Sequence, residues 1–292
     1  MTTHVEIIQT KRGRATNPPA RRGGAPRGVG RRTRNVLLGF GPAIVLILLW
    51  QLLTTLAASP FFPSPSRIIV RLYELWFSGP MTSLFATDLV WSDVIPSMSR
   101  ALAGWLLAVV IGIAVGSVAG QWSRAAAFID PPVNFMRSLP KPALVPIFLI
   151  ILGGTDWMRL AFIVFGCIWP VLLNTMQGVR SVDRTYRETA KAFHIPLWRT
   201  FLQVILPAAS PKIVAGMRVS LSLALILMVL SEWMLASNGL GFFLLESQRR
   251  FKIVDLWAAI MLLGLIGFLI NVLFLACEKR LLRWHRGLTL QS

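Results

Sequence analysis

Four stretches of this sequence carry no charged residue over a length that can cross a lipid bilayer. They are residues 36–58, 101–120, 160–179 and 256–277. A helix needs about 20 apolar residues to span the hydrocarbon core, and it satisfies its own backbone hydrogen bonds there. Two further stretches are less regular, since residues 142–155 are short and residues 204–230 contain Lys212 and Arg218 near their start. The sequence therefore predicts an all-α, polytopic membrane protein with about six transmembrane helices.

The distribution of charge predicts how these spans are oriented. Only 14% of the 292 residues are charged, and Lys and Arg number 30 against 12 Asp and Glu, for a net charge of +18. Such an excess fits either a nucleic-acid partner or the cytoplasmic side of a membrane. Most of the basic residues precede the first span, follow the last, or lie in alternate connections. This pattern favours a multi-pass protein of the plasma (inner) membrane with both termini cytoplasmic, and it argues against nucleic-acid binding.

The chain divides by composition into a tail, an anchor, a connection and a core. Residues 1–35 are rich in Arg, Gly and Pro and predict a disordered basic cytoplasmic tail, which either contacts anionic lipid or fixes the orientation of insertion. Residues 36–58 predict the first transmembrane helix, interpreted as an uncleaved anchor rather than a signal peptide because the apolar run is long. Residues 59–95 form an extracytoplasmic connection, residues 96–280 the core domain, and residues 281–292 a cytoplasmic tail.

Small residues recur at every fourth position of the second span, at Gly104, Ala108, Gly112, Gly116 and Gly120. In lipid, such a ridge lets another helix approach closely, because association there depends on packing contacts. We expect the ridge to pack against a helix of the same chain. A seam between two copies is the alternative.

Prolines interrupt the helical pattern between the second and third spans, at Pro131, Pro132 and Pro140. Residues 125–141 therefore predict either a helix at the membrane interface or a bent start to the third span. Irregular backbone at membrane depth must face protein or a water-filled cavity, so this region is a candidate wall of a pathway.

A basic, proline-containing segment, residues 181–206, lies on the predicted cytoplasmic side. Ser181 is a candidate cap for a first amphipathic helix, and Pro196 suits the first position of a second one. Pro207 is expected to end that second helix. Two short helices joined by a tight turn make a rigid protrusion, which either fits a groove on a partner or rests on the inner leaflet.

The segment contains Glu188, Thr189 and Ala190 and closes with VILP at residues 204–207. This pattern resembles the EAA loop of binding-protein-dependent ABC importer permeases. The similarity continues in SLPKPALVPIFLI (138–150), WPVLLNTMQGVRSVD (169–183) and SEWMLASNGLGFFL (231–244). Together these motifs resemble the nitrate, sulfonate and taurine branch of that family, over about residues 60 to 285.

The resemblance implies a type I ABC importer permease fold and a permease subunit, two copies of which form a homodimer. It also implies that the protrusion seats in a cleft of a cytoplasmic ABC ATPase subunit. The implied contact residues are Glu188, Thr189, Ala190, Phe193, His194 and Pro196. The family usually has glycine where His194 stands. We expect His194 to adopt the left-handed backbone that glycine would supply, rather than to act as a pH switch.

The chain contains no G-x-x-x-x-G-K-[ST] phosphate-binding loop, so ATP-driven transport needs a separate ATP-binding subunit. The resemblance implies alternating access driven by that ATPase, with a small solute such as a sulfonate, taurine or nitrate delivered by an extracytoplasmic solute-binding protein. Two alternatives are a self-sufficient secondary transporter and a membrane-embedded enzyme. We predict no catalytic residue, no cofactor and no metal site, since the three His residues do not cluster in the spans.

Polar residues inside the spans are candidates for a translocation pathway, because burying them in lipid is costly. They are Asn174, Gln177, Ser220, Ser222, Glu232 and Asn271. A hydrogen bond between helices is the alternative role for each. Glu232 is expected near the outer interface, where it either gates solute access or bonds to the glycine-rich turn SNGLG at residues 237–241.

Overall fold

The computed structural model describes residues 29–234 and 236–283, with side chains from residue 41 onward apart from residue 123. Every regular element among these residues is a helix, which confirms the predicted all-α class. The chain divides into two compact units, Met1–Trp50 and Gln51–Ser292, and the packing described below is that of the second unit. Residues 1–28 of the predicted basic tail lie outside the described residues.

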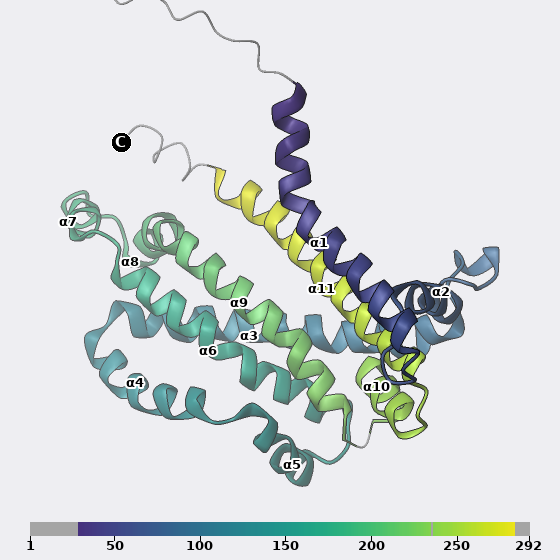
Figure 1. Ribbon diagram of the computed structural model, residues 1–292. Coiled ribbons are helices and arrows are strands. Elements are labelled where there is room, and N and C mark those ends of the chain that lie inside the picture. Colours follow the sequence, from purple (N-terminus) through teal and green to yellow (C-terminus); the bar gives the residue numbers. More distant parts are fainter. Residues whose placement is uncertain (1–28, 235, 284–292) are drawn as a thin grey trace, which may run out of the picture. The chain divides into compact units, whose positions relative to one another are not determined.

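The helices follow one another with short connections (Figure 1). The first α-helices are α1 (Val29–Ala57), α2 (Pro65–Trp76) and α3 (Ile95–Gln121). They are followed by α4 (Ser123–Ser138), α5 (Lys141–Leu152) and α6 (Asp156–Arg180). The chain continues through α7 (Arg184–Ala192), α8 (Leu197–Thr200), α9 (Leu206–Glu232), α10 (Leu240–Arg249) and α11 (Ile253–Leu281). A 3₁₀ turn lies at η1 (Met81–Ser83), and π turns lie at η2 (Val90–Val94) and η3 (Phe201–Ile205).

Within the described part of the chain, four helical stretches are long and apolar enough to cross a membrane. They are Val90–Gln121, Asp156–Arg180, Leu197–Glu232 and Ile253–Leu281. A fifth crossing arises if α4 and α5, which meet at 99°, act as one bent span. The apolar part of α1 from Gly41 to Ala57 is shorter.

Helix α6 packs between α3 and α9 and forms the centre of the buried core (Figure 1). Its side chains Phe162, Ile163 and Val171 join Ala108 of α3 and Leu227 of α9 in one apolar cluster. By contrast, α11 is exposed along most of its apolar length, as expected for a helix that faces lipid.

The small-residue ridge of the second span packs against α6 of the same chain, which confirms the preferred interpretation. A side-chain carbon added at Gly116 would lie 2.5 Å from the carbonyl oxygen of Leu172, and one added at Gly112 would lie 2.9 Å from Cβ of Val171. These separations are shorter than van der Waals contact. The two helices therefore approach closely because the ridge has no side chains in the way.

The chain bends between α4 and α5 at Leu139 and Pro140. Both residues have extended backbone, which is the conformation that a following proline favours at Leu139. The Lys141 ammonium donates to the carbonyl oxygens of Arg137 and Leu139, each at 3.0 Å, and so covers the end of α4. Pro131 and Pro132 lie inside α4, so the predicted break at these two residues is wrong.

Helix α2 is joined to the helices near the end of the chain. Arg71 Nε donates to Asp255 Oδ1 at 2.6 Å, and this hydrogen bond raises the pKa of the Arg71 guanidinium. Trp76 is fully buried and packs edge-on against Phe243 of α10, with 5.4 Å between ring centroids. The connection between the first and second spans is therefore anchored to α10 and α11.

Candidate functional site

Residues 181–206, here called the protrusion, form α7, a tight turn, α8 and the π turn η3. Figure 1 shows α7 beyond the ends of α6 and α9. Helix α7 is capped by Asp183, whose Oδ1 accepts from the Thr185 amide at 2.9 Å. That backbone hydrogen bond holds the pKa of the exposed Asp183 carboxyl below its ordinary value. The prediction that Ser181 is the cap is wrong, since Ser181 donates to Gly178 and closes α6 instead.

The turn after α7 confirms the expected backbone at His194, whose φ is +54°. The His194 amide donates to the Lys191 carbonyl at 3.0 Å, and the Ile195 amide donates to the Ala190 carbonyl at 2.9 Å. This pair of hydrogen bonds is a Schellman motif, in which the residue after the cap takes a left-handed conformation. The turn therefore satisfies the last carbonyls of α7 and sets the direction of α8.

The outer surface of the protrusion is rich in exposed apolar side chains. Phe193 is 76% exposed and Leu197 is 80% exposed, and Tyr186 and Trp198 are exposed as well. Among the predicted contact residues, Glu188, Thr189, Phe193, His194 and Pro196 are exposed, whereas Ala190 is buried. Glu188 is paired with Arg184, at 2.6 Å from Nε to Oε1. Ala190 therefore belongs to the support of the surface, and the other five residues belong to the surface itself.

The protrusion is connected firmly to the core. Arg187 of α7 donates to the Val179 carbonyl of α6 at 2.8 Å. Helix α8 runs through η3 into α9 without interruption, so that one helical stretch extends from Leu197 to Glu232. The prediction that Pro207 ends the helix is wrong. The preceding π turn shifts the hydrogen-bond register, with the Leu206 amide donating to the Phe201 carbonyl, and the helix passes through the proline.

A pocket of about 560 Å³ lies between α4, α5, α6 and α9 and is here called the polar pocket. Its polar lining comes from Arg137, Ser138, Lys141, Trp169, Asn174 and Gln177. Two of the predicted pathway residues, Asn174 and Gln177, therefore share one cavity with the bend between α4 and α5.

The other predicted pathway residues do not line the polar pocket. Ser220 is buried and accepts from Trp105 Nε1 at 2.9 Å, so it joins α9 to α3 as the alternative interpretation held. Ser222 and Asn271 are exposed on α9 and α11. These two residues are not brought together with any of the other candidates.

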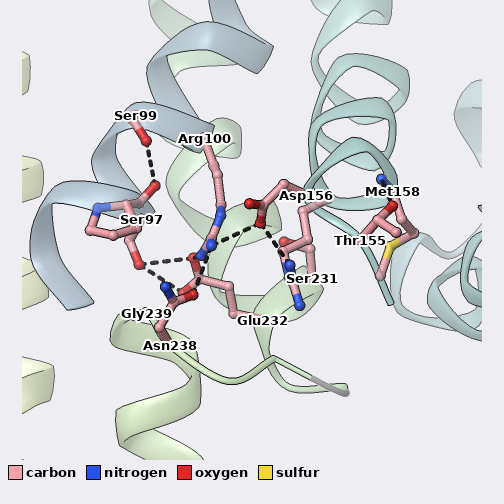
Figure 2. A network of polar contacts seen from close by, with 12 residues as sticks. Ser97, Ser99, Arg100, Thr155, Asp156, Met158, Ser231, Glu232, Asn238 and Gly239 are labelled. Atoms are coloured by element: carbon pink, nitrogen blue, oxygen red, sulfur yellow. Dashed lines mark hydrogen bonds and ion pairs between the residues drawn. The ribbon is translucent and has the colours of Figure 1, made fainter. Parts of the chain in front are cut away.

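Glu232 lies at the end of α9 farthest from the protrusion and is 1% exposed. Figure 2 shows Arg100 reaching from α3 toward Glu232 and Asp156. Arg100 Nη1 donates to Glu232 Oε1 at 2.9 Å, and Arg100 Nη2 pairs with Asp156 Oδ1 at 2.8 Å. The Ser97 hydroxyl also contacts both Glu232 oxygens at 2.8 Å. One carboxylate thus joins α3 to the end of α9, and Asp156 extends the network to α6.

The glycine-rich turn after α9 closes this network. The Gly241 amide donates to Glu232 Oε2 at 2.9 Å, and the Gly239 amide donates to Asp93 Oδ1 at 2.8 Å. Gly239 has φ of +113°, and a side-chain carbon there would lie 2.5 Å from Cδ of Glu232. The predicted bond between Glu232 and the SNGLG turn is confirmed. Both glycines are needed because the backbone approaches the carboxylate so closely.

The sequence of this chain matches a known protein family, described as "Binding-protein-dependent transport system inner membrane component", over residues 108–284. The match covers more than half of the 292 residues. The chain belongs to this family. It is therefore a membrane-spanning permease subunit of an ABC importer, and the protrusion lies within the matched residues.

Several relatives of this permease match it over most of their length. The putative aliphatic sulfonates transport permease protein SsuC of Bacillus subtilis is 28% identical, covering 88% of this chain and 91% of the relative. The taurine transport system permease protein TauC of Escherichia coli is 30% identical, covering 87% and 91%. The nitrate import permease protein NrtB of Synechocystis is 28% identical, covering 78% and 82%. The predicted branch of the family is therefore confirmed.

A solved structure supports the fold assignment of the permease. The permease matches a chain of the MetNI methionine ABC transporter, in an inward-facing conformation, with a TM-score of 0.57 and 16% sequence identity. The match covers 65% of this chain and 94% of that chain. The predicted type I ABC importer permease fold is confirmed.

Sequence reasoning missed most of the network around Glu232, including Arg100, Ser97 and Asp93. A signal was present, because Asp93 and Arg100 lie at the start of a long apolar run, and a charged residue in such a position is usually paired or functional. Sequence reasoning also missed Arg187, whose link to α6 depends on the turn between α6 and α7.

Proposed function

We propose that this permease works in an ATP-driven importer with a cytoplasmic ABC ATPase subunit, an extracytoplasmic solute-binding protein and a second copy of itself. The family description supports dependence on a binding protein. The proposed solute is a small oxyanion. Relatives with this branch's sequence carry names that refer to aliphatic sulfonates, taurine, nitrate and bicarbonate. A sulfonate group, nitrate and bicarbonate all present several oxygens around one central atom.

The observation that carries the proposal is the construction of the protrusion. Phe193, Leu197 and Trp198 expose apolar surface at the end of a rigid turn, and exposed apolar patches of this kind mark binding sites for protein partners. The charged pair Arg184 and Glu188 lies beside them on α7. In the proposed complex, this surface seats in a cleft of the ATPase, and movement of the ATPase on binding ATP displaces the protrusion.

Displacement of the protrusion would be passed to the membrane helices by two routes. The first is the continuous stretch from Leu197 to Glu232, which contains α8 and α9. The second is the hydrogen bond from Arg187 to the Val179 carbonyl at the end of α6. Because α6 and α9 also pack against each other, they would move together and open the polar pocket to one side of the membrane at a time.

The proposed topology places the protrusion and both termini in the cytoplasm. Residues 1–35 and 281–292 are then cytoplasmic tails, residues 36–58 the first transmembrane helix, residues 59–95 an extracytoplasmic connection, and residues 96–280 the core permease domain. The Lys and Arg distribution of the sequence supports this orientation. The network around Glu232 then faces the side from which the solute-binding protein delivers its cargo.

Reversing the charge of Glu188 tests the proposed docking. In proteoliposomes with the ATPase and the binding protein, we expect Glu188→Arg to reduce solute uptake per ATP hydrolysed at least tenfold, because the variant places a cation at the ATPase contact. Uptake and phosphate release are measured in the same vesicles. Unchanged coupling in correctly assembled complex would show that this surface is not the docking site.

A double variant separates docking from the local ion pair. Arg184→Glu combined with Glu188→Arg restores a pair on α7 but reverses the position of both charges on the surface. Recovery of coupling in the double variant would mean that Glu188 acts only through Arg184, at the 2.6 Å contact that the two share. Continued loss of coupling supports a direct contact between Glu188 and the ATPase.

A further inference from the structure

We propose that the polar pocket binds the anionic head group of an organic oxyanion, such as a short alkanesulfonate, during its passage through the permease. This proposal rests on the proposed function and assigns it a site. The polar pocket lies beside the C-terminal half of α6, from Gly166 to Gln177, in the half nearer the protrusion. Its volume of about 560 Å³ is in the range of small-molecule binding sites.

The chemistry of the lining favours a negatively charged ligand. Two cationic side chains, Arg137 and Lys141, line the pocket together with Asn174 and Gln177, whose amide groups can donate hydrogen bonds. Asn174 uses one of its two N–H groups on the Pro170 carbonyl, and the Ser138 hydroxyl already donates to the Phe135 carbonyl. The residues that form the lining, all in the described part of the chain, include no Asp or Glu. A cavity with positive charge and no carboxylate attracts anions and repels cations.

The two cations have different tasks. The Lys141 ammonium is held by carbonyl oxygens at the end of α4, so it supplies a fixed charge at the bend between α4 and α5. The Arg137 side chain is exposed in the pocket region, and the ion pairs found among the described residues do not include it. Its planar guanidinium is suited to two parallel hydrogen bonds with an oxyanion. Arg137 is therefore the expected direct ligand.

A buried donor without a partner provides independent support. The indole Nε1 of Trp169, which lines the polar pocket, is buried and has no hydrogen-bond partner among the described residues. Leaving a buried N–H unpaired is costly, so native structures usually satisfy such groups with protein, water or a ligand. An oxygen of a bound oxyanion would satisfy this donor once the indole edge turns toward the polar pocket.

The rest of the wall argues for an organic anion rather than a bare inorganic one. Pro170, Leu173 and Leu223 line the same cavity and present apolar surface. A sulfonate with a short alkyl chain can place its oxygens against Arg137 and Trp169 and its chain against these side chains. Nitrate can use only the polar part. We therefore expect the pocket to prefer ethanesulfonate over nitrate.

The experiment uses the assembled permease and ATPase in lipid nanodiscs, without the binding protein. Stimulation of ATP hydrolysis is titrated with ethanesulfonate, nitrate or chloride at constant ionic strength. We expect ethanesulfonate to stimulate ATP hydrolysis at a lower concentration than nitrate or chloride. Arg137→Gln should raise its half-maximal concentration about tenfold, and Arg137→Lys should recover part of the loss. Trp169→Phe, which keeps an aromatic ring but removes the N–H, should raise the half-maximal ethanesulfonate concentration about threefold.

Arg124→Gln is the matched control, because Arg124 is an exposed arginine of the same helix that does not line the polar pocket. The proposal would be overturned if Arg137→Gln, Arg124→Gln and the unchanged protein had the same half-maximal ethanesulfonate concentration. Equal stimulation of ATP hydrolysis by chloride and ethanesulfonate would also overturn it. Uptake by the full complex separates the two hypotheses. If the unchanged protein takes up an oxyanion and Arg137→Gln does not alter that uptake, the assignment of the binding site is wrong but the proposed function stands. If the unchanged protein takes up no oxyanion, the proposed function is wrong.

Discussion

At the scale of single residues, Glu232 joins three parts of the fold. It accepts hydrogen bonds from Arg100 and Ser97 of α3 and from the Gly241 amide of α10. Its side chain is fully buried, so these donors replace all of its contacts with water. A buried charge of this kind is stable only while its partners are present.

We predict that Glu232→Gln destabilises the protein by about 3 kcal/mol, because the change removes the buried one of the two carboxylates that pair with Arg100 and sets an N–H group against other donors. Thermal unfolding of the detergent-solubilised permease measures the effect. The control is Glu246→Gln, which breaks a partly exposed pair with Arg250 at the end of α10 and should cost less than about 1 kcal/mol. Equal midpoint temperatures of thermal unfolding for the two variants would contradict the assigned role of Glu232.

Single positions also show what the sequence could and could not predict. The left-handed backbone at His194 could be predicted because His194 stands where the family usually has glycine, and the structure confirms it. The cap residue of α7 could not be predicted. Ser181 and Asp183 are both good cap residues and lie two positions apart, so the choice depends on where α6 ends, which the contacts of Val179 and Gly178 determine.

At the scale of elements, both π turns end two positions before a proline. Val90–Val94 precedes Pro96, and Phe201–Ile205 precedes Pro207. In each case, the residue before the proline donates to a carbonyl five positions back, and the helix continues. A proline normally signals the end of a helix, because it lacks an N–H. The local sequence cannot reveal that a widened turn has removed the conflict, which is why the continuity of α8 and α9 was not predicted.

The packing of α3 on α6 depends on glycine at close approach. We predict that Gly116→Ala destabilises the protein by about 1–3 kcal/mol, since the added carbon would lie 2.5 Å from a backbone oxygen and would push the two helices apart. Gly264→Ala in α11 is the control, because a carbon added there meets nothing within 4 Å. Thermal unfolding of both variants decides the matter, and a loss of stability at Gly264 equal to that at Gly116 would argue against close packing as the cause.

At the scale of the whole molecule, the arrangement has two ends with different chemistry. The protrusion lies at one end of the stretch Leu197–Glu232, and the network around Glu232 lies at the other. With 36 residues, this stretch is about 50 Å long, which exceeds the thickness of the hydrocarbon core. The stretch is therefore long enough for its ends to reach the two opposite aqueous phases.

We predict that a cysteine at position 194 is accessible only from the cytoplasm. In a Cys277→Ser background, His194→Cys should react with a membrane-impermeant maleimide in inside-out vesicles but not in intact cells. Cys167 can remain, because it is fully buried. Met81→Cys is the control for the opposite face, since Met81 is 80% exposed in the connection after α2. Labelling at position 194 in intact cells, with Met81→Cys silent, would falsify the topology.

The fold class and the position of the protrusion could be predicted from sequence because long uncharged runs and a local motif determine them. The polar pocket could not be assembled in the same way. Arg137, Trp169 and Leu223 come from three separate helices, and their proximity depends on the 99° bend after Ser138 and on how α6 packs against α9.

The unbroken connection between α8 and α9 has a mechanical consequence. In the proposed complex, the ATPase would hold the inner end of this stretch, while ionic contacts hold the Glu232 end against α3. A tilt of the stretch about the core would then move its two ends in opposite directions, so that widening of the pathway at one membrane face would accompany narrowing at the other. The stiffness of this helix would thus oppose a state that is open on both sides, with the π turn as the place where it can bend.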